Sequence, residues 1–259
     1  MMDLEDWLKI EEEELSELKS LFALSEIDGG RDWIEDELIE CIRSHYDDPR
    51  NIADDITDLG FPAAGALLAE RLPTSPRARS GEIGEVLATE FIEYQTEFRV
   101  PVRRLRYKDG RNMALRGDDF LGVFEDDDDR LLLLKGEAKS GQYMGGGVIE
   151  EARNRLTADH GRPTPISLLF VIDRLLEATG TDRALGRRIR NEMGRRSLRP
   201  DRITHCIFTL TGNDPLDHLE SDIENADELR PHLSVNLRID DHADFIAWLY
   251  QEVSNLGDD

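Results

Sequence analysis

The stretch from Leu131 to Lys139 constrains the fold more than any other part of the sequence. Four consecutive leucines, 131–134, are followed by charged side chains at Lys135, Glu137 and Lys139. An apolar run of this length is typical of a strand that is buried on both faces. Because successive strand residues point to opposite faces, Glu137 and Lys139 share one face. Charged groups at the end of a buried strand are costly unless they pair or do chemistry, so this segment predicts a functional strand end.

A second strand is expected just before the leucine run. Arg-Gly-Asp-Asp at 116–119 leads into the apolar stretch that ends at Phe124, and a short acidic turn, 125–129, separates it from Leu131. Two strands joined by a short turn predict a hairpin, which would bring an aspartate beside Glu137. Asp119 is favoured because it shares a face with the apolar Leu121 and Val123, but Asp118 remains a candidate.

Carboxylate oxygens gathered at one point suit a hard cation such as Mg²⁺, for which Mn²⁺ can substitute. Such an ion stabilises charge in phosphodiester hydrolysis and lowers the pKa of a bound water. Lys139 could orient that water or stabilise the developing charge. The pattern therefore favours catalysis by Asp119, Glu137 and Lys139, with Asp119, Glu137 and Asp118 as candidate metal ligands. The alternative is a solvated strand end that holds only a Glu–Lys ion pair.

These motifs resemble those of the PD-(D/E)xK nucleases, in which an Asp and, on the next strand, Glu-x-Lys bind metal and cleave phosphodiesters. Gly81-Glu82-Ile83-Gly84-Glu85 resembles the glutamate-bearing first helix of that fold, which makes Glu85 a further candidate metal ligand. The sequence departs from the signature in one respect: Gly117-Asp118 stands where the family has Pro-Asp. That departure leaves open which aspartate is the ligand.

Taken together, the linker at Leu72-Pro73 and these motifs resemble the nuclease subunit of the Hachiman anti-phage system. The resemblance implies a restriction-endonuclease-like fold and degradation of DNA in complex with a helicase subunit. Two other functions stay open. One is a PD-(D/E)xK nuclease of restriction or repair, and the other is a non-catalytic adaptor that keeps the fold and binds protein through acidic surfaces. An adaptor has no need of an intact Asp, Glu and Lys set.

Periodicity along the chain predicts an α/β fold with a mixed sheet flanked by helices, after an acidic helical N-terminal region. The proline-rich segment 72–80 reads as a linker. It divides the chain into an acidic helical region, 1–72, and a nuclease domain, 73–259. Expected helices are 4–24, 32–45, 63–72, 81–94, 148–158, 183–194 and 243–253, and expected strands are 100–107, 119–124, 131–139, 166–172, 203–210 and 233–239.

The net charge of −24 is unevenly distributed along the chain. Residues 1–72 carry a net −15 and residues 205–259 a net −11, whereas residues 148–204 carry a net +4. Only the middle of the chain therefore suits the phosphates of DNA. Arg187, Arg188 and Arg195, on one expected helix and its exit, are candidate DNA contacts because arginine forks match phosphate oxygens. Pairing of these arginines with the acidic ends is an equal alternative.

The sequence also predicts a cytoplasmic protein with no membrane segment. No apolar run reaches the roughly 18 residues that are needed to cross a bilayer, and the acidic N-terminus lacks the features of a signal peptide. Cys41 and Cys206 lie far apart in apolar patterns, so we expect two reduced thiols and no disulfide.

Overall fold

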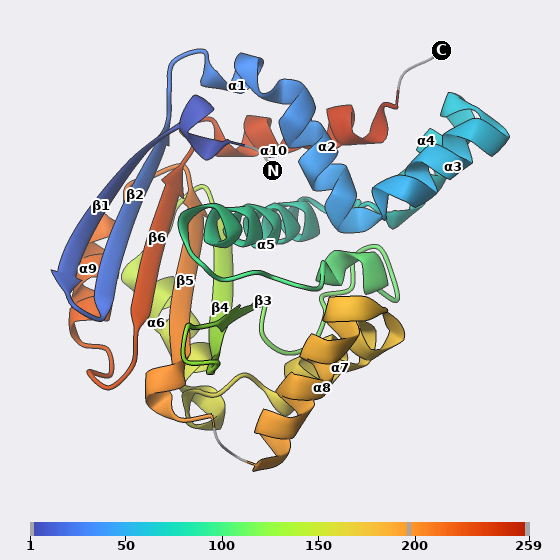
Figure 1. The fold of residues 1–259 in the computed structure, drawn as a ribbon. Helices are drawn as coiled ribbons and strands as arrows, with labels where there is room; N and C mark the ends of the chain where they lie inside the picture. Colours follow the sequence, from blue (N-terminus) through green and yellow to red (C-terminus); the bar gives the residue numbers. More distant parts are fainter. Residues whose placement is uncertain (1–2, 196–197, 257–259) are drawn as a thin grey trace.

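The computed structural model describes residues 3–195 and 198–256. Six strands form one mixed sheet in the order β1-β2-β6-β5-β4-β3 (Figure 1). The four inner strands, β2, β6, β5 and β4, run parallel, and the edge strands β1 and β3 are antiparallel to their neighbours. The strands are β1 (Leu8–Ser16), β2 (Lys19–Glu26), β3 (Phe120–Glu125), β4 (Leu131–Gly141), β5 (Ile203–Thr211) and β6 (His232–Arg238).

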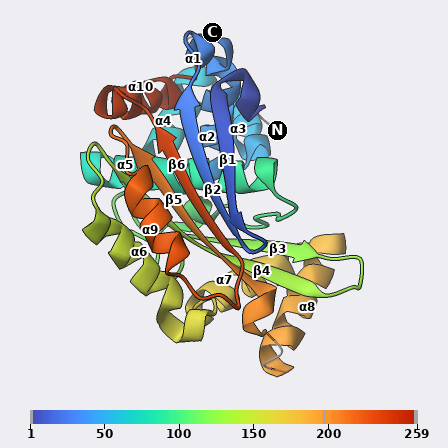
Figure 2. The same ribbon diagram turned by 90° about the vertical axis from the view of Figure 1, so that its left-hand side faces the viewer.

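Helices cover both faces of the sheet. Helix α5 crosses one face with α2 and α10 packed on it, and α6 and α9 cover the other face (Figure 2). Helices α7 and α8 pack together beside β3 and β4. The predicted α/β class with a flanked mixed sheet is confirmed. The helices are α1 (Gly30–Trp33), α2 (Glu35–Tyr46), α3 (Pro49–Leu59), α4 (Phe61–Arg71), α5 (Pro76–Gln95), α6 (Gly146–Thr157), α7 (Pro165–Glu177), α8 (Gly180–Arg195), α9 (Leu216–Glu224) and α10 (His242–Ser254).

The leucine run is the buried strand that its sequence predicted. Leu133 and Leu134 are inaccessible to solvent, and β4 lies between β3 and β5. The predicted hairpin is also present, with Phe120 opposite Gly136. A Cβ atom at Gly136 would lie 2.1 Å from the Phe120 ring, so glycine is what allows this ring to lie on β4.

The predicted helix over residues 4–24 is wrong, because this segment forms the β1–β2 hairpin. The apolar spacing is compatible with a helix, but Leu21, Phe22 and Leu24 are buried in the sheet instead, where β2 pairs with β6. Residues 11–14, all glutamate, lie exposed on β1 at the sheet edge. Charges along an edge strand discourage pairing with further strands. The sheet thus takes strands from both sides of the predicted boundary at residue 72.

The predicted buried strand at 166–172 is also wrong, because these residues belong to helix α7. Thr164 caps the helix by accepting a hydrogen bond from the Ser167 amide, and Pro165 occupies its first turn. These are strong helix-start signals. The apolar run is amphipathic on a helix, since Leu168 is buried and Ile166 exposed.

Residues 100–107 do not form the predicted strand either. Residues 100–103 belong to no strand, and Arg104–Tyr107 forms a 3-10 helix. Pro101 has no amide hydrogen to donate to a strand ladder, which explains the missing pairing. Helices α3 and α9 were not predicted.

Helix α5 starts earlier than the sequence indicated, which shortens the linker to residues 72–75. The Ser75 hydroxyl accepts a hydrogen bond from the Ala78 amide at 3.2 Å, and Pro76 is the first helical residue. No helix within the described parts of the chain is long and apolar enough to cross a membrane.

Candidate active site

Asp119 is held against the end of β4 by two backbone contacts. Its amide donates to the Gly136 carbonyl at 3.1 Å, and its carboxylate Oδ2 accepts from the Ala138 amide at 2.8 Å. These bonds fix the carboxylate opposite Glu137, as the hairpin predicted.

Arg104, which sequence reasoning missed, secures the segment that carries Asp119. The buried guanidinium donates to the carbonyl of Asp119 at 2.8 Å, to that of Arg116 at 2.8 Å, and to that of Asp118. Nothing in the local sequence singles out this arginine among its neighbours at 103 and 106. Its role depends on how the 3-10 helix meets the loop.

Asp118 is engaged elsewhere. Its side chain is 4% exposed, and its Oδ2 accepts from the Thr164 amide at 2.7 Å. Its Oδ1 lies 3.6 Å from the Lys135 ammonium, and its own amide donates to Ser167 Oγ at 2.7 Å. Asp118 therefore ties the start of α7 to β4, whereas Asp119 lies with the other candidate ligands.

Gly117 makes the turn that leads into the two aspartates. Its φ of +97° is in the left-handed region, which proline cannot adopt because its ring holds φ near −65°. An added Cβ would also lie 2.2 Å from Ser167 Oγ. The turn therefore requires glycine here, and it directs Asp118 and Asp119 to different partners.

Three carboxylates from three elements influence one another's titration: Glu85 on α5, Asp119 before β3, and Glu137 on β4. Burial raises the pKa of all three. The charge of Asp119 is the next cause for both Glu85 and Glu137, and Arg104 opposes it at Glu85. Each carboxyl group therefore loses its proton less readily than it would in water, and a bound cation would favour the ionised forms.

Glu137 lies beneath two cations. Its Oε1 is 3.0 Å from Lys139 Nζ and 3.0 Å from Arg155 Nη1, and its side chain is 3% exposed. Both cations also contact Glu151 on α6, at 3.3 Å and 3.2 Å. Arg155 is a second residue that sequence reasoning missed. The sequence gives its place on a helix but not the strand that this helix face covers.

A cavity of about 380 Å³ adjoins these groups. Glu85 and Asp119 line it directly, as do Lys139 and Arg155, whereas Glu137 lies behind the two cations. A larger cavity of about 530 Å³ lies between α6 and α9, and none of the predicted site residues lines it. The smaller cavity is therefore the one at which the candidate groups meet.

The predicted DNA-contacting arginines lie on α8. Arg187 and Arg195 are exposed. Arg188 pairs with Glu125 at 2.9 Å and with Asp129 at 2.8 Å. The acids that pair with Arg188 thus come from the β3–β4 hairpin and not from the ends of the chain.

The residues at the cavity fit a hard cation. Mg²⁺ takes oxygen ligands and keeps several waters, so it needs only one or two protein carboxylates in direct contact. The carboxylate oxygens of Glu85, Asp119 and Glu137 lie further apart than the ligand atoms of a second candidate metal-binding group, Cys41, His45 and Glu90. Among the described residues, Cys41, His45 and Glu90 have ligand atoms that all lie within 4.8 Å of one another. The wider acidic group suits an ion that retains its water.

The raised pKa of Glu137, about 7 against an ordinary value of 4.5, predicts a pH effect on stability. Because the folded state binds this proton more tightly than the unfolded chain does, the resulting stabilisation is complete below about pH 4.5 and is lost as pH rises through 7. We expect the unfolding free energy of metal-free protein to fall across this range relative to Glu137→Gln. Urea denaturation in EDTA at a series of pH values measures it, and parallel profiles for the two proteins would contradict it.

Comparison with known proteins gives two matches. The model of the HamA family matches residues 2–253, which is nearly the whole chain. The chain is also 30% identical over 109 residues to the Hachiman protein HamA of Bacillus cereus. The aligned part is 40% of this chain and 36% of that protein, so this match spans about a third of the relative's length.

Proposed function

The chain belongs to the HamA family, and from this membership and the acidic site we propose that it is a metal-dependent deoxyribonuclease of an antiviral defence complex, acting with a helicase subunit. The observation that carries the proposal is the meeting of Glu85, Asp119 and Glu137 with Lys139 beside one cavity, at the end of a buried strand. The defence role rests on the name of the Bacillus cereus relative.

The acidic side chains would hold Mg²⁺ or Mn²⁺. When bound, such an ion supplies charge stabilisation for phosphodiester cleavage and an acidified water. The Ala138 amide fixes one oxygen of Asp119, which leaves the other oxygen for a ligand. Glu85 approaches from α5, so the ligands come from separate elements that the core holds rigidly.

Lys139 and Arg155 are the cations available to a scissile phosphate, because both line the cavity. In the metal-free protein they neutralise Glu137 at 3.0 Å each. A cation beside Glu137 would take over that role and free their N–H donors for phosphate oxygens. Lys139 and Arg155 would therefore neutralise Glu137 in the metal-free protein and contact the phosphate when the metal is bound.

Charge distribution supports both proposed partners. The exposed arginines on α8 suit the DNA backbone. The acidic ends of the chain repel DNA and suit a cationic protein surface, such as one on the helicase subunit. A net charge of −24 also predicts weak DNA binding by the isolated chain.

Lys139→Ala should lower cleavage by about 10²–10³-fold, the usual loss when one donor to a developing charge is removed. Purified protein, alone and with the proposed helicase partner, is incubated with DNA and Mg²⁺ or Mn²⁺. Lys9→Ala is the matched control, since Lys9 is 62% exposed on β1 and pairs with its near neighbour Glu11. Equal cleavage by Lys139→Ala and the parent protein would contradict the assignment. Partner binding without any cleavage by the parent protein would favour the adaptor alternative.

A further inference from the structure

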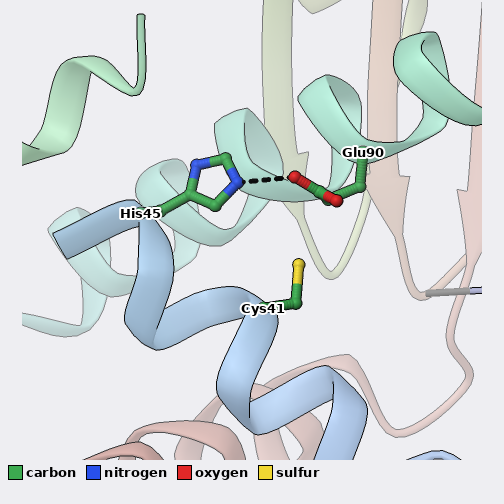
Figure 3. A group of neighbouring side chains, drawn as sticks. All are labelled: Cys41, His45 and Glu90. Atoms are coloured by element: carbon green, nitrogen blue, oxygen red, sulfur yellow. Dashed lines mark hydrogen bonds and ion pairs between the residues drawn. The ribbon is translucent and has the colours of Figure 1, made fainter. Parts of the chain in front are cut away.

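Cys41, His45 and Glu90 bring three different metal-binding groups to one point, apart from the acidic site. Cys41 and His45 are four residues apart on α2 and therefore project from the same side of that helix. Glu90 faces them from α5. The three side chains point toward one another (Figure 3). Their ligand atoms all lie within 4.8 Å of one another.

We propose that Cys41, His45 and Glu90 bind a zinc ion that joins α2 to α5. A thiolate, an imidazole and a carboxylate together bind Zn²⁺ in preference to Mg²⁺ or Ca²⁺. Zinc–ligand bonds of about 2.0–2.3 Å place tetrahedral donor atoms about 3.4 Å apart. His45 Nε2 and Glu90 Oε1 are now 2.8 Å apart, joined by a hydrogen bond. Small side-chain rotations therefore suffice to admit the ion.

The charges around the cluster allow this exchange. Glu90 also lies 3.1 Å from Arg103, but Arg103 makes a shorter contact of 2.6 Å with Glu93. Arg103 thus keeps a carboxylate partner when Glu90 turns to the ion. Zn²⁺ with one thiolate, one carboxylate and one neutral imidazole has no net charge, which lowers the cost of burial.

Proton release accompanies binding. Burial raises the pKa of the Cys41 thiol, and the charge of Glu90 raises it further, so without metal the thiol keeps its proton. Burial also lowers the pKa of His45, which keeps the imidazole neutral. Binding Zn²⁺ forms the Zn–S bond, breaks the S–H bond and releases the proton to solvent. The neutral imidazole needs no further deprotonation.

The proposed zinc site lies close to the acidic site. Glu90 lies on the same helix as Glu85, and a cavity of about 10 Å³ is lined by His45, Glu85 and Asp119 together. An ion bound by Cys41, His45 and Glu90 would hold α5 against α2, and α5 also carries Glu85 of the acidic site. Three protein ligands leave a fourth position for water or another group.

The test uses the full-length protein and Co²⁺ as a spectroscopic probe, in excess Mg²⁺ to fill the acidic site. We expect one equivalent of Co²⁺ to give a thiolate-to-cobalt charge-transfer band, and protein purified without chelator to contain close to one zinc by elemental analysis. Cys41→Ser should lose the band. Cys206→Ser, which alters the second, buried cysteine, and Asp119→Asn, which alters the acidic site, should both keep it.

A second measurement on the unaltered protein guards against a variant that fails to fold. Zinc added after chelation should raise the melting temperature by several degrees, because an ion that binds only the folded state stabilises it. Absence of both the band and the zinc-dependent rise in the parent protein would overturn the proposal. A band that survives Cys41→Ser would overturn it as well. Since neither readout involves DNA, the result is independent of the proposed nuclease activity.

Discussion

Asp119→Asn should abolish metal-dependent DNA cleavage and at the same time stabilise the metal-free protein by about 1–2 kcal/mol. Asparagine can still accept the hydrogen bond from the Ala138 amide, so the local structure is preserved. It removes a carboxylate whose pKa burial raises, and it relieves the charge that raises the pKa values of Glu85 and Glu137. Sites that hold like charges close together to bind a ligand commonly lower the stability of the folded protein.

Asp118→Asn is the matched comparison, and it should have the opposite effect. Removing this charge breaks the buried pair with Lys135 and weakens the contacts with Thr164, which costs on the order of 2–4 kcal/mol. Below its unfolding temperature the variant should still cleave DNA. Urea denaturation in EDTA and a cleavage assay with saturating Mg²⁺ measure the two effects. If Asp118→Asn loses cleavage while folded and Asp119→Asn retains it, the assignment of the two aspartates is reversed.

The site residues differ in how far the sequence could predict them. Strand parity and a buried leucine run place Glu137 and Lys139 on one face, and these are local properties of a few residues. The hairpin then brings an aspartate close. The choice between Asp118 and Asp119 depends on the left-handed turn at Gly117 and on contacts with α7, which lie some 46 residues further along the chain. Arg155 depends similarly on how α6 packs on β4.

Two of the failed fold predictions have different origins. Residues 4–24 carry an apolar spacing that fits a helix, yet pairing of β2 with β6, from the far end of the chain, determines their structure. For residues 166–172 the sequence does hold the decisive signal, in Thr164-Pro165, but the apolar run alone is equally consistent with a strand. Long-range strand pairing therefore decided the structure of residues 4–24, whereas a local capping signal decided that of residues 166–172.

Arg104→Met should unfold the protein more readily and misplace Asp119. The methionine has a similar length but cannot donate hydrogen bonds, so the buried carbonyl of Asp118 and the partly buried carbonyls of Arg116 and Asp119 lose their partner. Each unsatisfied buried acceptor costs about 1–3 kcal/mol, so we expect a total loss of about 3–5 kcal/mol. Where the variant is still folded, cleavage should fall by about 10²-fold, the usual effect of a displacement near 1 Å in a catalytic group.

Two control variants test whether Arg104 acts by positioning Asp119. Arg104→Lys tests the effect of the positive charge, and Arg116→Ala tests the effect of another change in the same loop. Lysine keeps the positive charge near Asp119 and Glu85 but lacks the planar fork that reaches several carbonyls, so it should restore only part of the stability. Arg116→Ala changes an exposed arginine of the same loop whose carbonyl is retained, and it should behave as the parent protein does.

Urea denaturation gives the stability, and Mg²⁺ titration of single-turnover cleavage gives the apparent metal affinity. A positioning role requires weaker metal binding in Arg104→Met than in Arg104→Lys, because only a displaced Asp119 changes the ligand geometry. Equal metal affinity in the two variants would mean that the Arg104 guanidinium stabilises the fold without determining the position of Asp119.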